Sequence, residues 1–185
     1  MSDEERRSWR ELGPPSRAEL LWLVGALVLL AALKLPYSAG WSFPAGYDGG
    51  YYTNIVQNLL AGEGLKTDVS LYHRGFREFP HIDSIYPLWP LLYAGFAGLF
   101  PLERVAVWLP TALYLTSLLA AWARGRRLSP EALWRRTPGL HGGHVLVLVL
   151  GLQSLYFTHT SRPFTEGLAY TLLFAAEGAP MLYYG

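Results

Sequence analysis

Residues 20 to 33 read LLWLVGALVLLAAL, an apolar run that contains no charged residue and ends at Lys34 and Pro36. With its flanking residues the run approaches the roughly 20 residues that cross a bilayer as a helix. The polar residues before it contain both Arg and Glu, and no small-residue cleavage pattern follows it, unlike in a cleaved signal peptide. We therefore expect an uncleaved membrane span near 20–36, preceded by a polar tail at 1–19.

The composition of the whole chain is also that of a membrane protein. Of its 185 residues, 51% are apolar and only 16% are charged, and the mean hydropathy is positive. The 7 Trp and 12 Tyr suit the aromatic belts that form where a membrane meets water. A net charge of +1 provides no global field that would favour a nucleic-acid partner. The absence of cysteine excludes disulfides and thiolate metal sites.

The distribution of arginine indicates which of the later apolar stretches cross the membrane. These stretches are 85–100, 105–123, 145–157 and 164–176. Arginines gather in the N-terminal tail and in the loop 124–144, and cytoplasmic segments collect basic residues, so both are expected inside. An even number of crossings must separate them, and the spans at 20–36 and 105–123 provide it.

The stretch 85–100 is then expected to lie on the outer membrane surface. It would be about 24 Å long as a helix, and Pro87 and Pro90 interrupt its first half. The alternative is a short true span that violates the arginine rule.

The sequence therefore predicts an all-α, polytopic integral membrane protein with a cytoplasmic N-terminus. About four transmembrane helices are expected, near 20–36, 105–123, 145–160 and 164–180. The large first outer loop, 37–104, should contain two amphipathic surface helices, near 51–61 and 85–100. Arg strongly outnumbers Lys, which is typical of a GC-rich bacterial genome, so the bacterial inner membrane is the expected location.

A candidate catalytic acid, Asp48, precedes the first surface helix. Residues 51–60 read YYTNIVQNLL and place apolar side chains on one half of a helical wheel and amides and Thr on the other. Gly62 and Gly64 supply a C-terminal stop, and a short helix of this kind should lie flat in the membrane interface. Asp48 is either an N-cap or turn residue or a general base toward an acceptor hydroxyl or amine, and these roles are compatible.

Other charged side chains expected on the outer side suit a phosphate ligand. In the loop these are Arg74, Arg77, His73 and His81, and a solvated polar loop is the alternative. Arg162 and Glu166 lie near the outer end of the third expected span. Arg162 would contact a lipid phosphate, whereas Glu166 either favours a helix start or supplies a second outward-facing acid. Widely spaced His and Asp residues are a weak metal signal, so no metal is expected.

Taken in order, these residues resemble the N-terminal part of the GT-C superfamily of membrane glycosyltransferases. The closest resemblance is to the branch that contains protein O-mannosyltransferases and aminoarabinose transferases, and it covers residues 20 to about 176. The motifs that carry it are YDGGYY at 47–52, GEGL at 62–65, YPLWPL at 86–91 and a Ser-Arg-x-x-x-Glu element at 161–166.

The resemblance implies an inverting sugar transfer from a polyprenyl-phosphate donor to an acceptor at the outer membrane face. Asp48 would activate the acceptor and Arg162 would meet the donor phosphate, with no cofactor. The implied partners are the lipid bilayer, the lipid-linked donor and an unknown acceptor.

Two features depart from this family. Gly49 stands where many members carry a second acid, and members are usually several hundred residues long, so we expect a fragment that holds half of a site. The other hypothesis is a non-enzymatic polytopic module, such as a transporter or an assembly subunit. The stretch 105–123 has few polar residues in its interior, which favours a surface reaction over transport.

Overall fold

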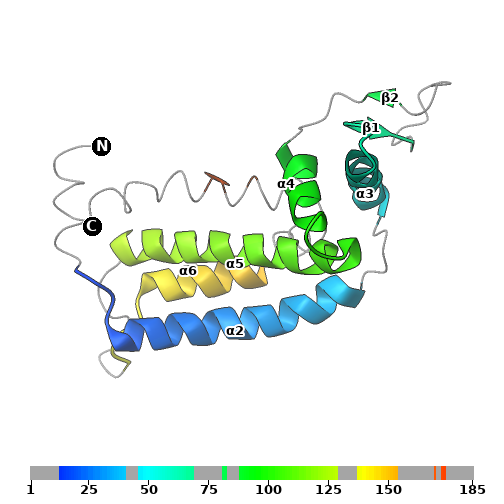
Figure 1. The fold of residues 1–185 in the computed structure, drawn as a ribbon. Helices are drawn as coiled ribbons and strands as arrows, with labels where there is room; N and C mark the ends of the chain where they lie inside the picture. The colour runs from blue at the N-terminus through cyan, green and yellow to red at the C-terminus, as the bar shows by residue number, and fades with distance from the viewer. Residues whose placement is uncertain are drawn as a thin grey trace, which may run out of the picture. The chain divides into compact units, whose positions relative to one another are not determined.

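The computed structural model describes residues 13–40, 46–68, 81–82, 88–128, 137–153, 169 and 172–173, and this part of the chain is mostly helical. In chain order the elements are α2 (Arg17–Gly40), α3 (Gly46–Leu60), β1 (Lys66–Thr67), β2 (His81–Ile82), α4 (Leu88–Ala97), α5 (Leu102–Leu128) and α6 (Gly142–Leu152) (Figure 1). The two strands form an antiparallel pair in which Lys66 lies opposite Ile82 and Thr67 lies opposite His81. The predicted helical class is thus confirmed, with one very short sheet that the sequence did not indicate.

The chain divides into two compact units. Among the described elements, unit 1 contains α6, α2 up to Leu33 and α5 from Tyr114. Unit 2 contains α3, β1, β2, α4, the end of α2 from Lys34 and the start of α5 up to Leu113.

Among the residues that the structure describes, two helices are long and apolar enough to cross a membrane. They are α2, with a mean hydropathy of 2.1 over its most apolar window, and α5, with 1.5. Only 17% of that window is buried in α2, against 56% in α5. Side chains such as Leu21, Val24 and Val28 on α2 are 74%, 55% and 62% exposed. A long helix with so much exposed apolar surface is typical of a segment that lipid covers.

The expected total of about four spans is not confirmed. Within the span expected near 145–160 the structure describes the end of α6, a helix of 11 residues that is about 16 Å long, and residues 154–160 lie outside the described part of the chain. Of the fourth expected span, 164–180, only residues 169, 172 and 173 are described.

Both long helices extend beyond the spans expected near 20–36 and 105–123. The helix α2 continues through Lys34 and Pro36, which were expected to close it. Proline inside a helix removes one hydrogen bond and crowds the carbonyl four residues before it, and α2 nevertheless continues for four residues after Pro36. The helix α5 continues past Ala123 through the first arginines of the expected inner loop. Arginine is a good helix former, and positive charge suits the C-terminal end of the helix dipole.

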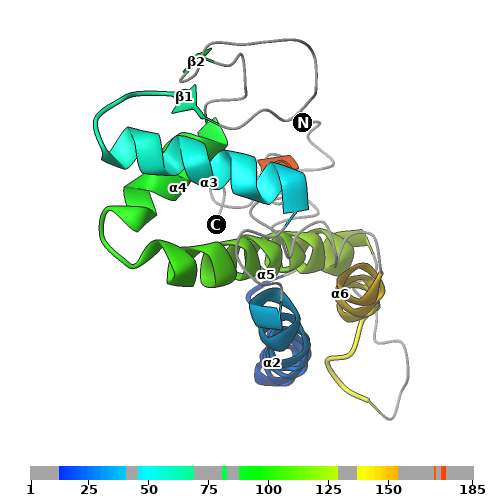
Figure 2. The same cartoon turned by 90° about the vertical axis from the view of Figure 1, so that its right-hand side faces the viewer.

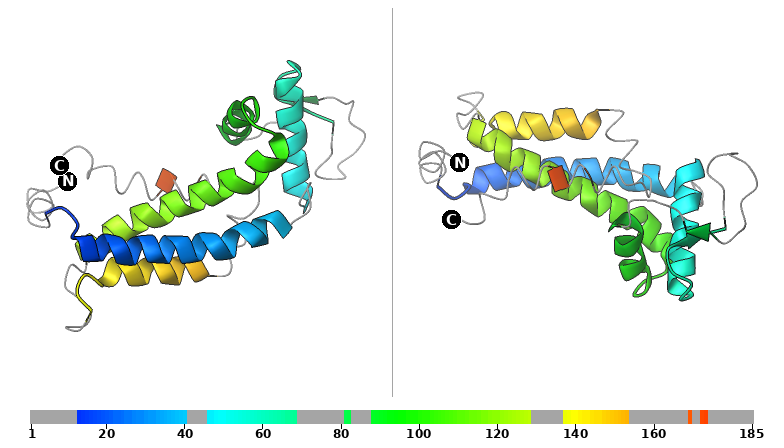
Figure 3. Two further views of the ribbon diagram at one scale, coloured as in Figure 1. Left: turned by 60° about the horizontal axis from the view of Figure 1, so that its bottom comes forward. Right: turned by 90° about the horizontal axis from the view of Figure 1, so that it is seen from above.

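The helices of unit 1 pack around a small apolar core. Its buried residues are Leu23, Leu30, Tyr114, Leu118, Trp122 and Val147, and Figures 2 and 3 show α6 lying beside α2 and α5. The Tyr114 hydroxyl donates a hydrogen bond to the Gly151 carbonyl over 2.6 Å. A Cβ atom on Gly151 would lie 2.6 Å from a methyl carbon of Leu30. The glycine therefore permits the close approach of α6 to α2.

Unit 2 has its own core, in which α4 and the start of α5 cover the apolar half of α3. The buried residues of this cluster are Val56, Trp89, Tyr93, Val105, Ala106 and Leu109. On α3, Tyr51 is 1% exposed and Ile55 is 3% exposed. The expectation that a membrane interface covers this half of the helix is therefore wrong for these side chains, because protein covers them.

The second expected surface helix is α4, and it is shorter than the predicted 85–100. Its 10 residues extend about 15 Å, and the expectation that this stretch does not cross the membrane stays a prediction. Pro90 does not break it, because it is the third residue of the helix and its missing N–H has no intrahelical partner there.

Candidate functional site

Asp48 lies inside the first turn of α3, because the helix begins at Gly46 and not at Tyr51. The N-cap interpretation is therefore wrong, since Asp48 is already the third residue of the helix. An acid in the first turn interacts favourably with the positive end of the helix dipole. The side chain of Asp48 is outside the part of the chain that the structure describes.

The predicted phosphate ligands are largely outside the described residues. His81 belongs to β2, where it lies opposite Thr67, and its side chain is not among those described. Arg74, Arg77, Arg162 and Glu166 lie outside the described residues. That these side chains bind a phosphate therefore stays a prediction.

The polar half of α3 anchors the strand that follows it. The side-chain oxygen of Asn54 accepts hydrogen bonds from the Thr67 hydroxyl at 3.1 Å and from the Asp68 backbone N–H at 2.7 Å. Asn58 donates to the Lys66 carbonyl at 3.1 Å and to the Asp68 carboxylate at 3.0 Å. The helix that carries Asp48 is thus fixed on both of its faces by protein contacts.

A second polar cluster, which the sequence did not reveal, joins the start of α2 to the end of α5. Arg126 donates from Nε to Glu19 Oε1 over 2.7 Å, and both side chains are only 13% exposed. Arg126 also donates to the carbonyl oxygens of Gly13 at 3.1 Å and of Pro14 at 3.4 Å. Ser16 and Glu19 exchange hydrogen bonds at 2.6 and 3.2 Å and cap the helix reciprocally. One acidic side chain therefore both caps α2 and binds α5.

His141 lies directly before α6 and contacts this ion pair. Its Nδ1 accepts a hydrogen bond from the Gly143 N–H at 3.0 Å and caps the helix, while its Nε2 lies 3.3 Å from Glu19 Oε1. Burial, and then the neighbouring His144, lower the pKa of His141 to about 4. The imidazole is therefore neutral near pH 7, with its proton on Nε2 and facing the carboxylate.

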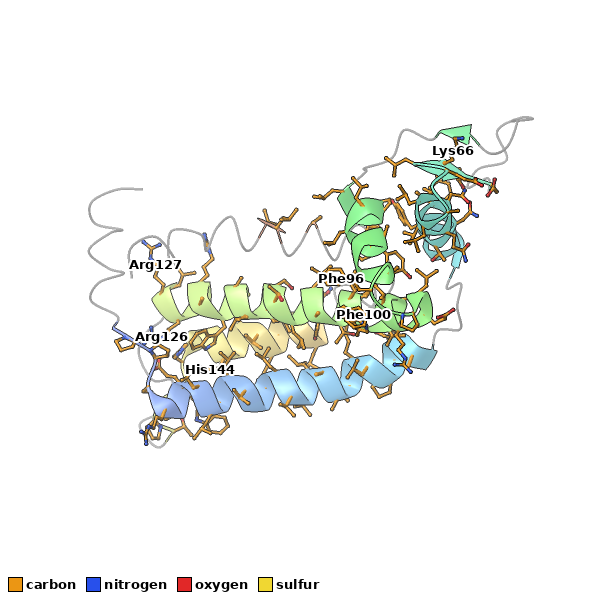
Figure 4. The ribbon with its side chains drawn as sticks, viewed as in Figure 1. Lys66, Phe96, Phe100, Arg126, Arg127 and His144 are labelled. Atoms are coloured by element: carbon orange, nitrogen blue, oxygen red, sulfur yellow. The ribbon has the colours of Figure 1, made fainter. Side chains whose placement is uncertain are left out.

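The tautomer of His144 follows from its hydrogen-bond partners. Its Nδ1 lies 3.3 Å from the donating N–H of His141, and its Nε2 lies 3.0 Å from the Glu19 carbonyl and 3.2 Å from the Trp122 indole nitrogen. A proton on Nε2 satisfies the first two contacts, whereas a proton on Nδ1 satisfies only the contact with Trp122. We therefore assign the Nε2–H form, which binds the start of α2 directly. Figure 4 shows His144 between α2 and α5.

Two short patterns mark this cluster in the sequence. They are Ser16 followed three residues later by Glu19, a capping-box pattern, and the pair His141 and His144 at the same spacing. In the sequence, Arg126 served only as one sign that the loop 124–144 is cytoplasmic. In the structure it donates the hydrogen bonds that join α5 to the start of α2. Across the residues that the structure describes, no group of three or more His, Asp or Glu is placed to hold a metal ion.

Comparisons of the chain with protein-family profiles, with curated proteins and with solved structures give no match.

Proposed function

We propose that this chain acts in the manner of a GT-C membrane glycosyltransferase, transferring a sugar from a polyprenyl-phosphate donor to an acceptor at the outer face of the bacterial inner membrane. The observation that carries the proposal is the position of Asp48. It lies in the first turn of α3, and only residues 41–45 separate α3 from the candidate span α2. A carboxylate at that position can meet a polar acceptor while a lipid-linked donor stays in the bilayer.

In the proposed reaction the Asp48 carboxylate takes the proton from an acceptor hydroxyl or amine. The acceptor atom then bonds to the anomeric carbon from the face opposite the phosphate, and the bond from that carbon to the phosphate oxygen breaks. Polyprenyl phosphate leaves with the bonding electron pair, and the configuration of the sugar inverts. The proposed ligands of the donor phosphate are Arg162, Arg74, Arg77 and His81, with Glu166 as a neighbouring acid.

The proposed topology has a cytoplasmic N-terminus and four spans, near 20–36, 105–123, 145–160 and 164–180. The arginine distribution supports it. Because the chain has no native cysteine, the single variant Leu102→Cys can test it by labelling in intact cells. Labelling from the outer side is expected, and labelling only from the cytoplasm would contradict the topology.

The chemistry is tested by Asp48→Asn, which keeps the size of the side chain and removes the base. Sugar transfer from polyprenyl phosphate by membranes that contain equal amounts of each variant should fall about 10²–10⁴-fold. The matched control is Asp68→Asn, which changes another acid of unit 2 but keeps an oxygen that can accept the bond from Asn58. Arg162→Lys should weaken donor binding instead, because Lys cannot reproduce the planar fork.

Near-normal transfer by Asp48→Asn would contradict the proposal and leave Asp48 as a residue that stabilises the helix start. Such a result would favour the non-enzymatic membrane module. A loss that Asp68→Asn shares equally would assign the effect to folding of unit 2 and also count against a specific base.

A further inference from the structure

The start of α6 is capped by two imidazole rings, each of which accepts a hydrogen bond from a backbone N–H. Nδ1 of His141 accepts from the Gly143 N–H at 3.0 Å, and Nδ1 of His144 accepts from the His141 N–H at 3.3 Å. The two rings are buried, and their centroids are 4.2 Å apart. A ring nitrogen accepts a hydrogen bond only while it carries no proton. The cap of α6 therefore requires both rings to be neutral.

The other nitrogen of each ring faces Glu19 in the first turn of α2. His141 Nε2 lies 3.3 Å from Glu19 Oε1, and His144 Nε2 lies 3.0 Å from the Glu19 carbonyl oxygen. The same Oε1 accepts the hydrogen bond from Arg126 Nε. Among the described residues, the charged and titratable groups that face His141 are thus His144 on α6, Glu19 on α2 and Arg126 on α5. The described residues 137–140, which precede it, contain no titratable side chain.

Glycines allow these segments to approach each other closely at the start of α6. A Cβ atom on Gly143 would lie 2.6 Å from the Trp122 carbonyl oxygen, and one on Gly125 would lie 2.6 Å from the Gly143 Cα atom. In the turn before α6, Gly139 has a φ of +82°, and a Cβ atom there would lie 2.7 Å from the Glu19 nitrogen. Backbone therefore lies against backbone at this end of α6, and the two histidines supply the polar side-chain contacts that fix it.

A second proton on either ring removes an acceptor from the cap. A protonated imidazole donates from both nitrogens, so Nδ1–H of His141 would face the Gly143 N–H, and Nδ1–H of His144 would face the His141 N–H. Attraction to Glu19 favours the protonated form of His141, but burial, and then His144, outweigh it and lower the pKa of His141 to about 4.

The direction of the pH effect follows from this lowered pKa. A His141 ring that has left the cluster regains an ordinary pKa of about 6.5, so the released form binds the proton more tightly than the packed form. The contact of α6 with α2 is therefore fully stabilised above pH 6.5, and this stabilisation is lost as the pH falls toward 4.

We propose that His141 and His144 form an acid-sensitive latch, which holds the start of α6 to α2 and α5 while both rings are neutral and releases it when they are protonated. We call the two residues the histidine latch. The later part of α6 stays in place through Val147 in the core and through the bond from the Tyr114 hydroxyl to the Gly151 carbonyl. Release is therefore confined to residues 137–147, and it does not depend on the proposed sugar transfer.

The test is hydrogen–deuterium exchange of the full chain in neutral detergent micelles at pH 7, 6 and 5. Mass spectrometry of peptides, corrected for the intrinsic pH dependence of amide exchange, reports how often residues 137–147 open. The internal reference is α4, whose sequence contains no side chain that titrates between pH 5 and pH 7. The principal variant is the double change His141→Asn and His144→Gln. Asn is a good N-cap residue, Gln at the third helical position can complete a capping box, and neither side chain titrates.

In the wild type, opening of residues 137–147 should be about twentyfold more frequent at pH 5 than at pH 7. The protection of α4 should stay unchanged over the same range. The double variant should be protected like the wild type at pH 7, and its protection should change less than about threefold down to pH 5. Each single variant should lose part of the pH dependence.

Equal protection of residues 137–147 at pH 7 and pH 5 in the wild type would overturn the proposal. An undiminished pH dependence in the double variant would overturn it as well. A loss of protection that α4 shares equally would show general acid unfolding instead of a latch and would also count against it. If the double variant does not fold, the two single variants and the comparison of residues 137–147 with α4 in the wild type still decide the question.

Discussion

Replacing Glu19 by Gln should weaken the attachment of α2 to α5 while leaving the start of α2 capped. Glu19 accepts a hydrogen bond from Arg126 at 2.7 Å and another from the Ser16 N–H at 2.6 Å. Gln has the same length and keeps one acceptor oxygen, so a capping bond can persist. The charge-assisted bond to Arg126 becomes an ordinary one. Hydrogen bonds to charged groups contribute about 1.5–3 kcal/mol and neutral ones about 1 kcal/mol.

The exposure of the pair sets the size of the effect. Both side chains are 13% exposed, which places the contact between surface ion pairs, worth about 0–1 kcal/mol, and fully buried pairs, whose disruption costs about 3–5 kcal/mol. We expect Glu19→Gln to lower the free energy of unfolding by about 2 kcal/mol. Arg126→Gln should cost about 3 kcal/mol, because it also removes the bonds to the Gly13 and Pro14 carbonyls.

A double-mutant cycle isolates the pair. The double variant should lose less stability than the two single changes together, with a coupling energy of about 1–2 kcal/mol. The measurement is unfolding in mixed micelles by increasing dodecyl sulfate, followed by far-ultraviolet circular dichroism. Glu63→Gln is the control, because Glu63 is exposed, and its change should stay within about 0.5 kcal/mol. A coupling energy below about 0.3 kcal/mol, or equal costs for Glu19→Gln and Glu63→Gln, would refute the reasoning.

Two further predictions concern α6 and the helices against which it packs. The folded pKa of His141 is about 4, below its usual 6.5, so between these values the unfolded chain binds the extra proton and stability falls as the pH is lowered from 7 toward 4. His141→Asn keeps an N-cap side chain and should reduce the loss of stability between pH 7 and pH 4 by about 1–2 kcal/mol. The measurement is the free energy of unfolding at pH 7, 5.5 and 4. Identical pH profiles for the variant and the wild type would contradict a lowered pKa of His141. Gly143→Ala would place a Cβ atom 2.6 Å from the Trp122 carbonyl oxygen and should cost about 1–3 kcal/mol. Gly25→Ala meets nothing within 4 Å and should stabilise α2 by up to about 1 kcal/mol, so thermal shifts of the same sign in both variants would refute this account.

Hydropathy located the helices but not their ends. A helix of membrane length is encoded by one continuous apolar stretch of sequence. The helices α2 and α5 were therefore predictable from residues 20–36 and 105–123. The continuation through Pro36 was not predictable, because a proline within a helical pattern usually ends or kinks the helix at the preceding residue. The wheel pattern of 51–60 predicted the amphipathic part of α3. It could not say whether lipid or α4 covers the apolar half, because either solution satisfies the same pattern.

The polar cluster of unit 1 escaped prediction for a different reason. Glu19 and Arg126 are 107 residues apart in the chain, and no local pattern relates them. Arg126 also had a sufficient local explanation, as one of the arginines of the expected cytoplasmic loop. His141 and His144 likewise read as loop residues until α6 places both rings against the start of α2. By contrast, the start of the helix that carries Asp48 was predicted within five residues, because Asp48 and the wheel pattern of 51–60 belong to one continuous segment.

The polar cluster also changes how the arginines of α2 and α5 are counted when the topology is predicted. Counting basic residues assigns equal weight to Arg17, Arg124, Arg126 and Arg127, but Arg126 is neutralised by Glu19 inside the fold. The ion pair lies at the ends of α2 and α5 and not in their apolar middles, so it escapes most of the cost of placing charges at the bilayer centre. One pair of opposite charges can thus join α2 to α5 at this end of unit 1.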